Sequence, residues 1–172
     1  MTKTAESINQ SVIETRHYLH QHPEISDHEF KTTQYITERL EALGYRIITP
    51  EGLNTGVIAE IGQGHPVVAL RSDIDALPIQ ETTGLPFASE NDGVMHACGH
   101  DFHMASLLGA AELLADEKKS LNGTIRLIFQ PAEETHVGAQ EVVDAGGTKG
   151  IDAIFGFHNK PDLKAGEIGL LP

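Results

Sequence analysis

The strongest constraint on the fold is a regular alternation of helical and strand-like patterns along the chain. The segment 99–115, GHDFHMASLLGAAELLA, repeats apolar residues at helical spacing, and the apolar segment 123–130 reads as a strand that Pro131 ends. A further helix at about 133–143 and a further strand at 153–157 follow. Alternation of this kind is typical of a layered sheet. The sequence therefore predicts the α/β class, with a mixed sheet that carries helices on both faces.

The first half of the chain begins with two helical patterns. A loose apolar stripe over residues 6–20 predicts one helix. The stretch SDHE predicts a capping box for a second helix that ends near Gly44, with Ser26 accepting the backbone N–H of Glu29 and the Glu29 carboxylate reaching back. Short β-branched runs then predict three strands, at residues 46–49, 56–61 and 67–71.

Composition narrows the class of protein. The chain has 25 acidic and 12 basic residues and a formal net charge of −13, without a dense basic run, which argues against nucleic acid as a partner. Neither a signal peptide nor an apolar run near the roughly 20 residues of a membrane span is seen. The single cysteine forms no intramolecular disulfide, so we expect a cytoplasmic protein. A length of 172 residues predicts one domain, over residues 1–172.

Polar patches lie where predicted strands end or predicted helices begin. The carboxyl ends of the strands in an open α/β sheet gather along one edge, and the loops there form the ligand crevice. We therefore expect these patches to converge on one site. The patches are RSDIDALP (71–78), MHACGHD (95–101), QPAEE (130–134) and GFHNKPD (156–162).

Cys98 has three candidate roles. Free cysteines usually pack as small apolar side chains. Here Gly99 and the flanking histidines make the setting polar, and the dipole of the expected helix should lower the thiol pKa. As a nucleophile, Cys98 would need a histidine base such as His158. As a ligand, it would offer sulfur beside the imidazole of His100. The last two roles stay open at this point.

The adjacent Glu133 and Glu134 follow an apolar strand and predict a division of labour. Neighbouring side chains project differently, so one carboxylate can bind an ion while the other moves a proton, as metal-assisted hydrolysis requires. A further histidine, His158, follows the next strand. The predicted mixed ligand set is Cys98, His100, Glu134 and His158.

Asp73 and Asp75 also follow an apolar strand. Such a pair can simply turn the chain, or it can accept the free ring N–H of a metal-binding histidine and fix its tautomer. We expect the second role. The other histidines lack convergent partners in the sequence, and those predicted not to bind metal are His17, His20, His22, His28, His65, His103 and His136.

Five ordered segments carry a resemblance to a known family. They are TRHYLHQHPEIS, RSDIDALPI, MHACGHDFHMASLLGAA, LIFQPAEE and DAIFGFHNKPD. Together they resemble the two-metal aminoacylase and carboxypeptidase family. The branch is that of the hippurate hydrolases, the auxin-conjugate amidohydrolases and the N-acetyl-diaminopimelate deacetylases. The fold implied is a catalytic domain of the zinc-exopeptidase type.

The resemblance also implies a mechanism. Cys98 would bridge two divalent ions, with His100, Glu134 and His158 as the other ligands and Glu133 as general base and acid. A metal-bridging water would attack the amide carbonyl of an N-acyl amino acid, without an acyl-enzyme. Thiolate and imidazole donors suit Zn²⁺, and the resemblance also implies Mn²⁺, Ni²⁺ or Co²⁺ as possible metals.

Family members continue beyond GEIGLLP into a lid or dimerisation domain, and then return to the catalytic domain with a final histidine ligand. We therefore expect residues 1–172 to correspond to the N-terminal part of the catalytic domain, weakly active or inactive alone and prone to self-association through exposed strand edges. The full-length form is expected to be a homodimer. Two alternatives stay open: a cysteine-nucleophile hydrolase and a non-catalytic metal-binding domain.

Overall fold

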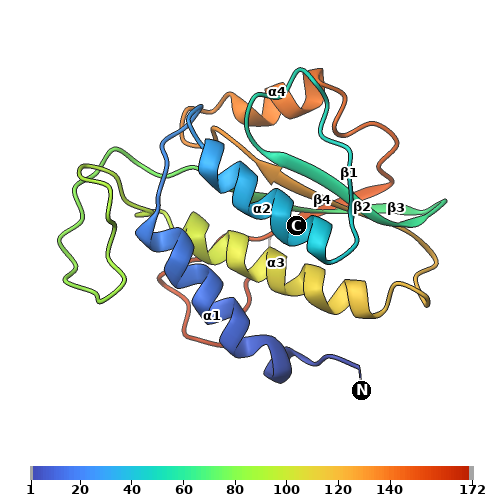
Figure 1. The fold of residues 1–172 in the computed structure, drawn as a ribbon, viewed down its shortest axis with the longest axis horizontal. Coiled ribbons are helices and arrows are strands. Elements are labelled where there is room, and N and C mark those ends of the chain that lie inside the picture. Colours follow the sequence, from blue (N-terminus) through green and yellow to red (C-terminus); the bar gives the residue numbers. More distant parts are fainter. Residues whose placement is uncertain (1, 171–172) are drawn as a thin grey trace.

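The computed structural model describes residues 2–170 and forms a five-stranded mixed sheet with helices on both faces (Figure 1). The predicted α/β class and its two-sided helix cover are therefore confirmed. The strands are β1 (Arg46–Ile47), β2 (Val57–Gln63), β3 (Val67–Asp73), β4 (Gly123–Gln130) and β5 (Ala153–Gly156).

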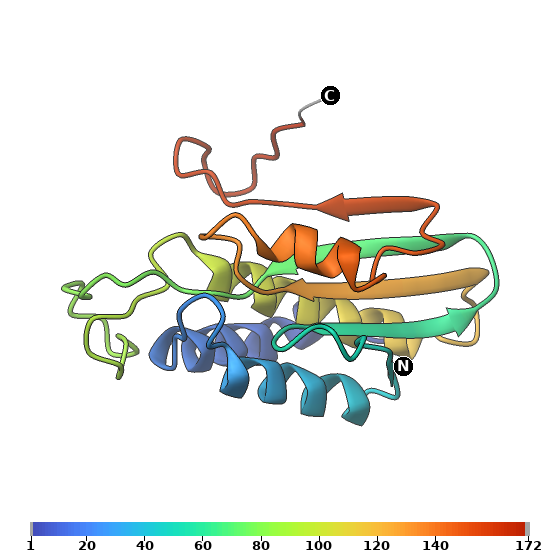
Figure 2. The ribbon, with the colours of Figure 1, turned by 90° about the horizontal axis from the view of Figure 1, so that it is seen from above.

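The strand order is β1-β2-β4-β3-β5, with β5 at one edge. β3 lies parallel to β4 and to β5, whereas β2 runs antiparallel to β4 and to β1. Figure 2 shows β5 as the outermost strand, beside β3. Because three neighbouring strands are parallel, their carboxyl ends meet at one edge of the sheet.

One face of the sheet carries three helices: α1 (Ala5–Gln21), α2 (Phe30–Ala42) and α3 (His100–Asp116). Leu40 of α2 and Met104 of α3 pack with Phe129 of β4 in one apolar cluster. The outermost of the three, α1, packs on α3 (Figure 1). Gly109 allows this close approach, since a Cβ there would lie 2.6 Å from Cγ2 of Val12.

The opposite face carries only α4 (Gly138–Asp144) among the described residues (Figure 1). Val142 packs with Ile58 and Ile128 in a second, smaller cluster. Both clusters draw on β2 and β4, because successive strand residues point to opposite faces. Across residues 2–170, no helix has the length and apolar character that a membrane crossing requires.

The predicted capping box is wrong. Glu29 is the N-cap of α2 but makes no side-chain capping bond. The Ser26 hydroxyl donates to Asp75 Oδ2 at 2.7 Å, and the carboxylate of Glu29 accepts from Thr55 and Ala132. The side chains of Ser26 and Glu29 therefore form hydrogen bonds with residues distant in sequence instead of forming the capping box.

Two predicted elements are shorter than expected. β1 covers only Arg46–Ile47, and α4 begins at Gly138 rather than near Glu133. The residue before the Glu pair, Ala132, has a φ of 49°, and residues 133–136 form a turn. The chain after β4 therefore turns at residues 133–136 before α4 begins at Gly138.

The register of the parallel strands aligns the predicted polar patches. Asp73, at the end of β3, lies opposite Gln130 at the end of β4, and Arg71 lies opposite Gly156 at the end of β5. The first turn of α3 lies at the same edge, because His103 contacts Asp73 there. The expected convergence of the four patches is thus a consequence of strand register.

Candidate metal centre

Gly99 places the cysteine motif against the end of β5. It is the N-cap of α3 and has φ 89°, ψ 21°, a left-handed conformation that glycine adopts without a Cβ penalty. A Cβ at this position would lie 2.6 Å from Oδ1 of Asn159. The turn therefore brings Cys98 and His100 beside the His158 segment, which a side chain at position 99 would push away.

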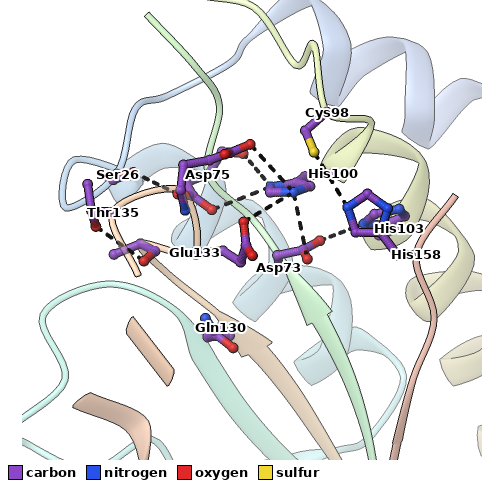
Figure 3. A network of polar contacts seen from close by, with 12 residues as sticks. Ser26, Asp73, Asp75, Cys98, His100, His103, Gln130, Glu133, Thr135 and His158 are labelled. Atoms are coloured by element: carbon purple, nitrogen blue, oxygen red, sulfur yellow. Dashed lines mark hydrogen bonds and ion pairs between the residues drawn. The ribbon is translucent and has the colours of Figure 1, made fainter. Parts of the chain in front are cut away.

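Cys98, His100 and Glu134 converge. One ligand atom from each lies within 4.8 Å of the others, although Glu134 is distant in sequence from Cys98 and His100. The Cys98 Sγ also lies 3.4 Å from Nε2 of His158. Figure 3 shows Cys98 pointing toward His158, while the ring of His100 lies beside them and faces the carboxylates. The structure thus brings the four residues predicted as ligands into one cluster.

The ring of His100 is held in a defined orientation. Its Nδ1–H donates to the backbone carbonyl of Asp75 at 2.8 Å, so in the neutral ring the lone pair lies on Nε2. Nε2 lies 3.8 Å from Glu133 Oε2 and 3.8 Å from Glu134 Oε1. The histidine is fully buried and points its acceptor nitrogen at two carboxylates.

Two buried atoms in this cluster have no hydrogen-bond partner among residues 2–170: His100 Nε2 and Glu134 Oε1. An acceptor nitrogen and a carboxylate oxygen that face each other without a donor are unfavourable unless a cation lies between them. Zinc accepts thiolate, imidazole and carboxylate ligands, and carboxylates also suit manganese. These residues therefore fit a divalent metal ion.

Glu133 and Glu134 differ in exposure and in backbone contacts. The side chain of Glu133 is 33% exposed and that of Glu134 is 19% exposed. The N–H of Glu134 donates to Asp75 Oδ2 at 2.9 Å, and the same oxygen accepts from Ser26. Glu134 is thus fixed deeper in the site, whereas Glu133 faces the more open side.

Asp73 contacts a different histidine from the one expected. Its Oδ1 accepts Nδ1–H of His103 at 2.6 Å, and its Oδ2 lies 3.7 Å from His100 Nε2. Burial alone would raise the pKa of Asp73. The His103 hydrogen bond and the charges of His100 and Arg71 outweigh it and lower the pKa to about 2. Asp73 is therefore a buried carboxylate that supports His103, and Asp75 supports His100 chiefly through its backbone carbonyl.

His103 lies in the cluster, one helical turn after His100, although it was predicted not to bind metal. Its ligand atom lies within 4.8 Å of those of Asp73, His100 and His158. Its Nδ1 contacts Asp73, and its Nε2 accepts the N–H of Asn159 at 3.0 Å. Both ring nitrogens therefore have protein partners, consistent with a non-ligand that orients the His158 segment. The i, i+3 spacing of His100 and His103 was the available signal, because it places both on one helix face.

The thiol of Cys98 differs from the expectation of a lowered pKa. Burial, followed by the negative charge of Glu134, raises the pKa of Cys98 to about 11. The residue precedes the N-cap of α3 rather than lying in its first turn, so nearby carboxylates outweigh the helix dipole. Without a cation the thiol stays protonated at neutral pH, whereas a bound metal ion deprotonates a coordinating thiol.

Relatives of known name match nearly the whole chain. The chain is 54% identical over 166 residues to an N-acetyl-L-cysteine deacetylase of Bacillus subtilis, covering 95% of this chain and 40% of that protein. It is 42% identical over 172 residues to an N-acyl-L-amino acid amidohydrolase of Geobacillus stearothermophilus, covering 98% of this chain and 46% of the relative. The chain thus spans less than half the length of these relatives.

Solved structures share the fold. A Bacillus subtilis protein described as a dinuclear metal binding peptidase from the M20 family superposes with a TM-score of 0.88 at 54% identity, over 92% of this chain and 45% of that one. A putative aminohydrolase of Staphylococcus aureus gives a TM-score of 0.88 at 43% identity, over 92% and 43%. A family model described as peptidase family M20/M25/M40 matches residues 69–172, which carry every predicted site residue. The chain belongs to the peptidase family M20/M25/M40.

Proposed function

We propose that this chain carries the metal-binding and proton-transfer groups for metal-dependent hydrolysis of the amide bond in N-acyl amino acids or related small amides. One observation carries the proposal: Cys98, His100 and Glu134 converge around two buried, unpartnered ligand atoms. The names of the relatives support the substrate class, since they include an N-acetyl-L-cysteine deacetylase and an N-acyl-L-amino acid amidohydrolase.

Two of the proposed ligands are held in place by Asp75. Cys98, His100, Glu134 and His158 would hold the divalent cations. The ring of His100 presents Nε2 because Asp75 accepts from Nδ1, and the backbone of Glu134 is held by the Asp75 carboxylate. When bound, the cations polarise the scissile carbonyl and stabilise its developing negative charge.

Glu133 moves the proton. Its carboxylate lies on the open side of the cluster, 3.8 Å from Nε2 of His100, where a substrate and a water molecule can approach it. It takes the proton from the attacking water and passes it to the nitrogen of the departing amine. The two adjacent glutamates thus divide ion binding from proton transfer.

Metal analysis with an activity panel tests the proposal. The purified 172-residue chain should bind about two equivalents of Mn²⁺ or Zn²⁺. Cleavage of N-acetyl and N-benzoyl amino acids, by this chain or by one joined to the remaining length of a relative, should be lost on chelation and restored by metal. A chain that binds no divalent ion, or cleavage that survives chelation, would contradict the proposal. Metal binding without cleavage by the extended form would support the non-catalytic alternative.

A cysteine-nucleophile hydrolase is the second candidate, favoured by the 3.4 Å contact between Cys98 Sγ and His158 Nε2. The raised pKa of Cys98, about 11, weighs against it, because a nucleophilic thiol needs a lowered pKa. Thiol alkylation that abolishes cleavage while chelation does not would favour this candidate.

The proposal extends to the metal, the cellular location and the oligomeric state. Mn²⁺ or Zn²⁺ is the proposed metal, since thiolate and imidazole ligands suit Zn²⁺ and carboxylate ligands suit Mn²⁺. A cytoplasmic location is proposed from the single cysteine. A homodimer is proposed for the full-length form, and sedimentation of such a form would test it.

A further inference from the structure

Glu29 is a buried carboxylate outside the ligand cluster, and it joins two loops that are distant in sequence. Its Oε1 accepts the backbone N–H of Ala132 at 2.8 Å, and its Oε2 accepts the hydroxyl of Thr55 at 2.8 Å. The side chain is 0% exposed. Glu29 thus ties the start of α2 to the loop that follows β4, although 103 residues separate it from Ala132.

Ala132 has a backbone conformation that needs support. Its φ of 49° lies in the left-handed region, which residues with a Cβ disfavour. It is fully buried and directly precedes Glu133 and Glu134. Its carbonyl accepts from the N–H of Gly138 at 3.1 Å, so Glu29 completes the hydrogen bonding of this residue from the other side. The conformation at Ala132 sets the direction in which the Glu pair leaves the strand.

The surroundings of Glu29 leave little room for an alternative arrangement. A Cβ at Gly56 would lie 2.7 Å from the carbonyl oxygen of Phe129 and 2.7 Å from Cδ of Pro131. The N–H of Gly56 donates to Thr33 Oγ1 of α2 at 2.8 Å. The loop at residues 55–56 is therefore clamped between α2 and the end of β4, and it presents Thr55 to the carboxylate.

Burial of the Glu29 carboxyl group is costly, and the side chain makes no capping bond to α2 that would offset this cost. Burial raises its pKa, and the hydrogen bonds from Ala132 and Thr55 only partly oppose this. A buried carboxyl group without a role would be unfavourable against an apolar side chain of similar size. The partner that Glu29 holds is the turn carrying the Glu pair.

We propose that Glu29 is a positioning residue, which holds Ala132 in its left-handed conformation and thereby aims Glu134 at the metal ions and Glu133 at the open side of the site. This inference rests on the proposed metal-dependent function. It concerns a side chain that touches neither the ligand atoms of the cluster nor the substrate.

Metal affinity of the 172-residue chain tests the inference without any need for turnover. Glu29→Met keeps a side chain of similar length but leaves the N–H of Ala132 without its acceptor, so Mn²⁺ affinity should fall roughly 10- to 100-fold, as for other residues that orient ligands. Glu29→Gln retains an oxygen that can accept this N–H, so its affinity should stay within about threefold of wild type. Mn²⁺ binding is measured by electron paramagnetic resonance, and folding by circular dichroism.

Glu24→Met is the matched control. Glu24 also accepts at the start of α2, from the N–H groups of Lys31 and Thr32, but has no contact with Ala132. Its substitution should leave Mn²⁺ affinity within about threefold of wild type, even if α2 is weakened. Ala132→Gly, introduced into Glu29→Met, should restore part of the lost affinity, because glycine adopts the left-handed conformation without support.

Two results would overturn the inference: a folded Glu29→Met chain with wild-type Mn²⁺ affinity, or an equal loss in Glu24→Met. If Glu29→Met does not fold, Glu29→Asp carries the same test, since it keeps the charge but shortens the reach to Ala132. Failure of the proposed function looks different: wild type would bind no Mn²⁺, or Cys98→Ala and Glu134→Gln would leave its affinity unchanged.

Discussion

At the scale of single residues, the chemistry of Cys98 depends on which charges surround it. Burial and Glu134 raise its pKa to about 11, so the metal-free thiol is protonated and inert. A divalent cation between the thiol and the carboxylate would reverse the sign of the local field and deprotonate the thiol. The same carboxylate that disfavours a cysteine nucleophile therefore favours a cysteine ligand.

Cys98→Ala should impair metal binding, whereas Glu133→Gln should impair proton transfer. Loss of the thiolate should lower metal occupancy after dialysis, whereas Glu133→Gln should retain metal, because its carboxylate is the more exposed of the pair. In an active extended form, Glu133→Gln should lower kcat by about 10²- to 10⁴-fold. Metal content by mass spectrometry and kcat on one substrate give both readouts. If Glu134→Gln keeps metal and Glu133→Gln loses it, the two roles are reversed.

At the scale of elements, an ion-pair network around the buried His20 joins α1 to the first turn of α3 and to the long segment between β3 and α3. His20 Nδ1 lies 2.9 Å from Asp101 Oδ2, and its Nε2 lies 3.2 Å from Glu81 Oε1. Arg16 also reaches Asp101, at 3.0 Å. The hydrogen bond with Asp101, opposed by burial, raises the pKa of His20 above its ordinary value of 6.5.

This network predicts a pH-dependent contribution to stability. Because the pKa of His20 is raised in the folded state, its contribution is fully present below the unfolded pKa, about 6.5, and is lost as pH rises through the folded pKa. Guanidinium unfolding at a series of pH values should show this decline in wild type, and His20→Gln should flatten it. His22→Gln, at the C-cap of the same helix, serves as control and should retain the wild-type slope. Parallel curves for wild type and His20→Gln would contradict the prediction.

The contact between α1 and α3 predicts a steric effect at Gly109. A larger side chain there meets Cγ2 of Val12, so Gly109→Leu should lower the free energy of unfolding by about 1–3 kcal/mol. The better helix propensity of leucine offsets part of this loss. Urea unfolding measures the change. If the loss comes from overpacking against Val12, Gly109→Leu should cost less stability in a Val12→Ala background. Strictly additive free-energy changes in the double variant would refute overpacking as the cause.

At the scale of the whole molecule, the sheet ends in an apolar edge strand. Ile154 and Phe155 of β5 are 52% and 62% exposed, and they point to opposite faces because strand residues alternate. β5 pairs only with β3 among the described strands, so its outer edge also presents unpaired backbone groups (Figure 2). An exposed apolar edge without charged residues favours association with another chain.

The 172-residue chain should therefore self-associate as its concentration rises. Phe155→Lys places a charge on β5 and should shift the chain toward the monomer in sedimentation velocity. Ile13→Lys removes an exposed apolar side chain of α1 and is the matched control, which should leave self-association unchanged. A monomeric wild type at all concentrations, or equal effects of the two substitutions, would argue against β5 as the contact.

The sequence alone determined the fold class and most of the elements, and it predicted the residues of the proposed ligand cluster. Long periodic segments such as α3 and β4 were predicted within one or two residues, because their apolar spacing reflects burial that any compact fold would require. Cys98, His100, Glu134 and His158 were predicted from their residue types at strand ends and from the resemblance. Strand register then brought them together.

Only the tertiary structure decided how the short polar segments are used. The SDHE stretch satisfied a local capping rule, yet Ser26 and Glu29 bind Asp75 and Ala132, which lie 49 and 103 residues away. Contacts between residues distant in sequence also explain three other differences. These are the late start of α4, the pairing of Asp73 with His103 and the raised pKa of Cys98. Apolar periodicity is a local property that a sequence displays directly. The partner of a buried polar group is chosen among all donors that folding brings within about 3 Å, and no local pattern encodes that choice.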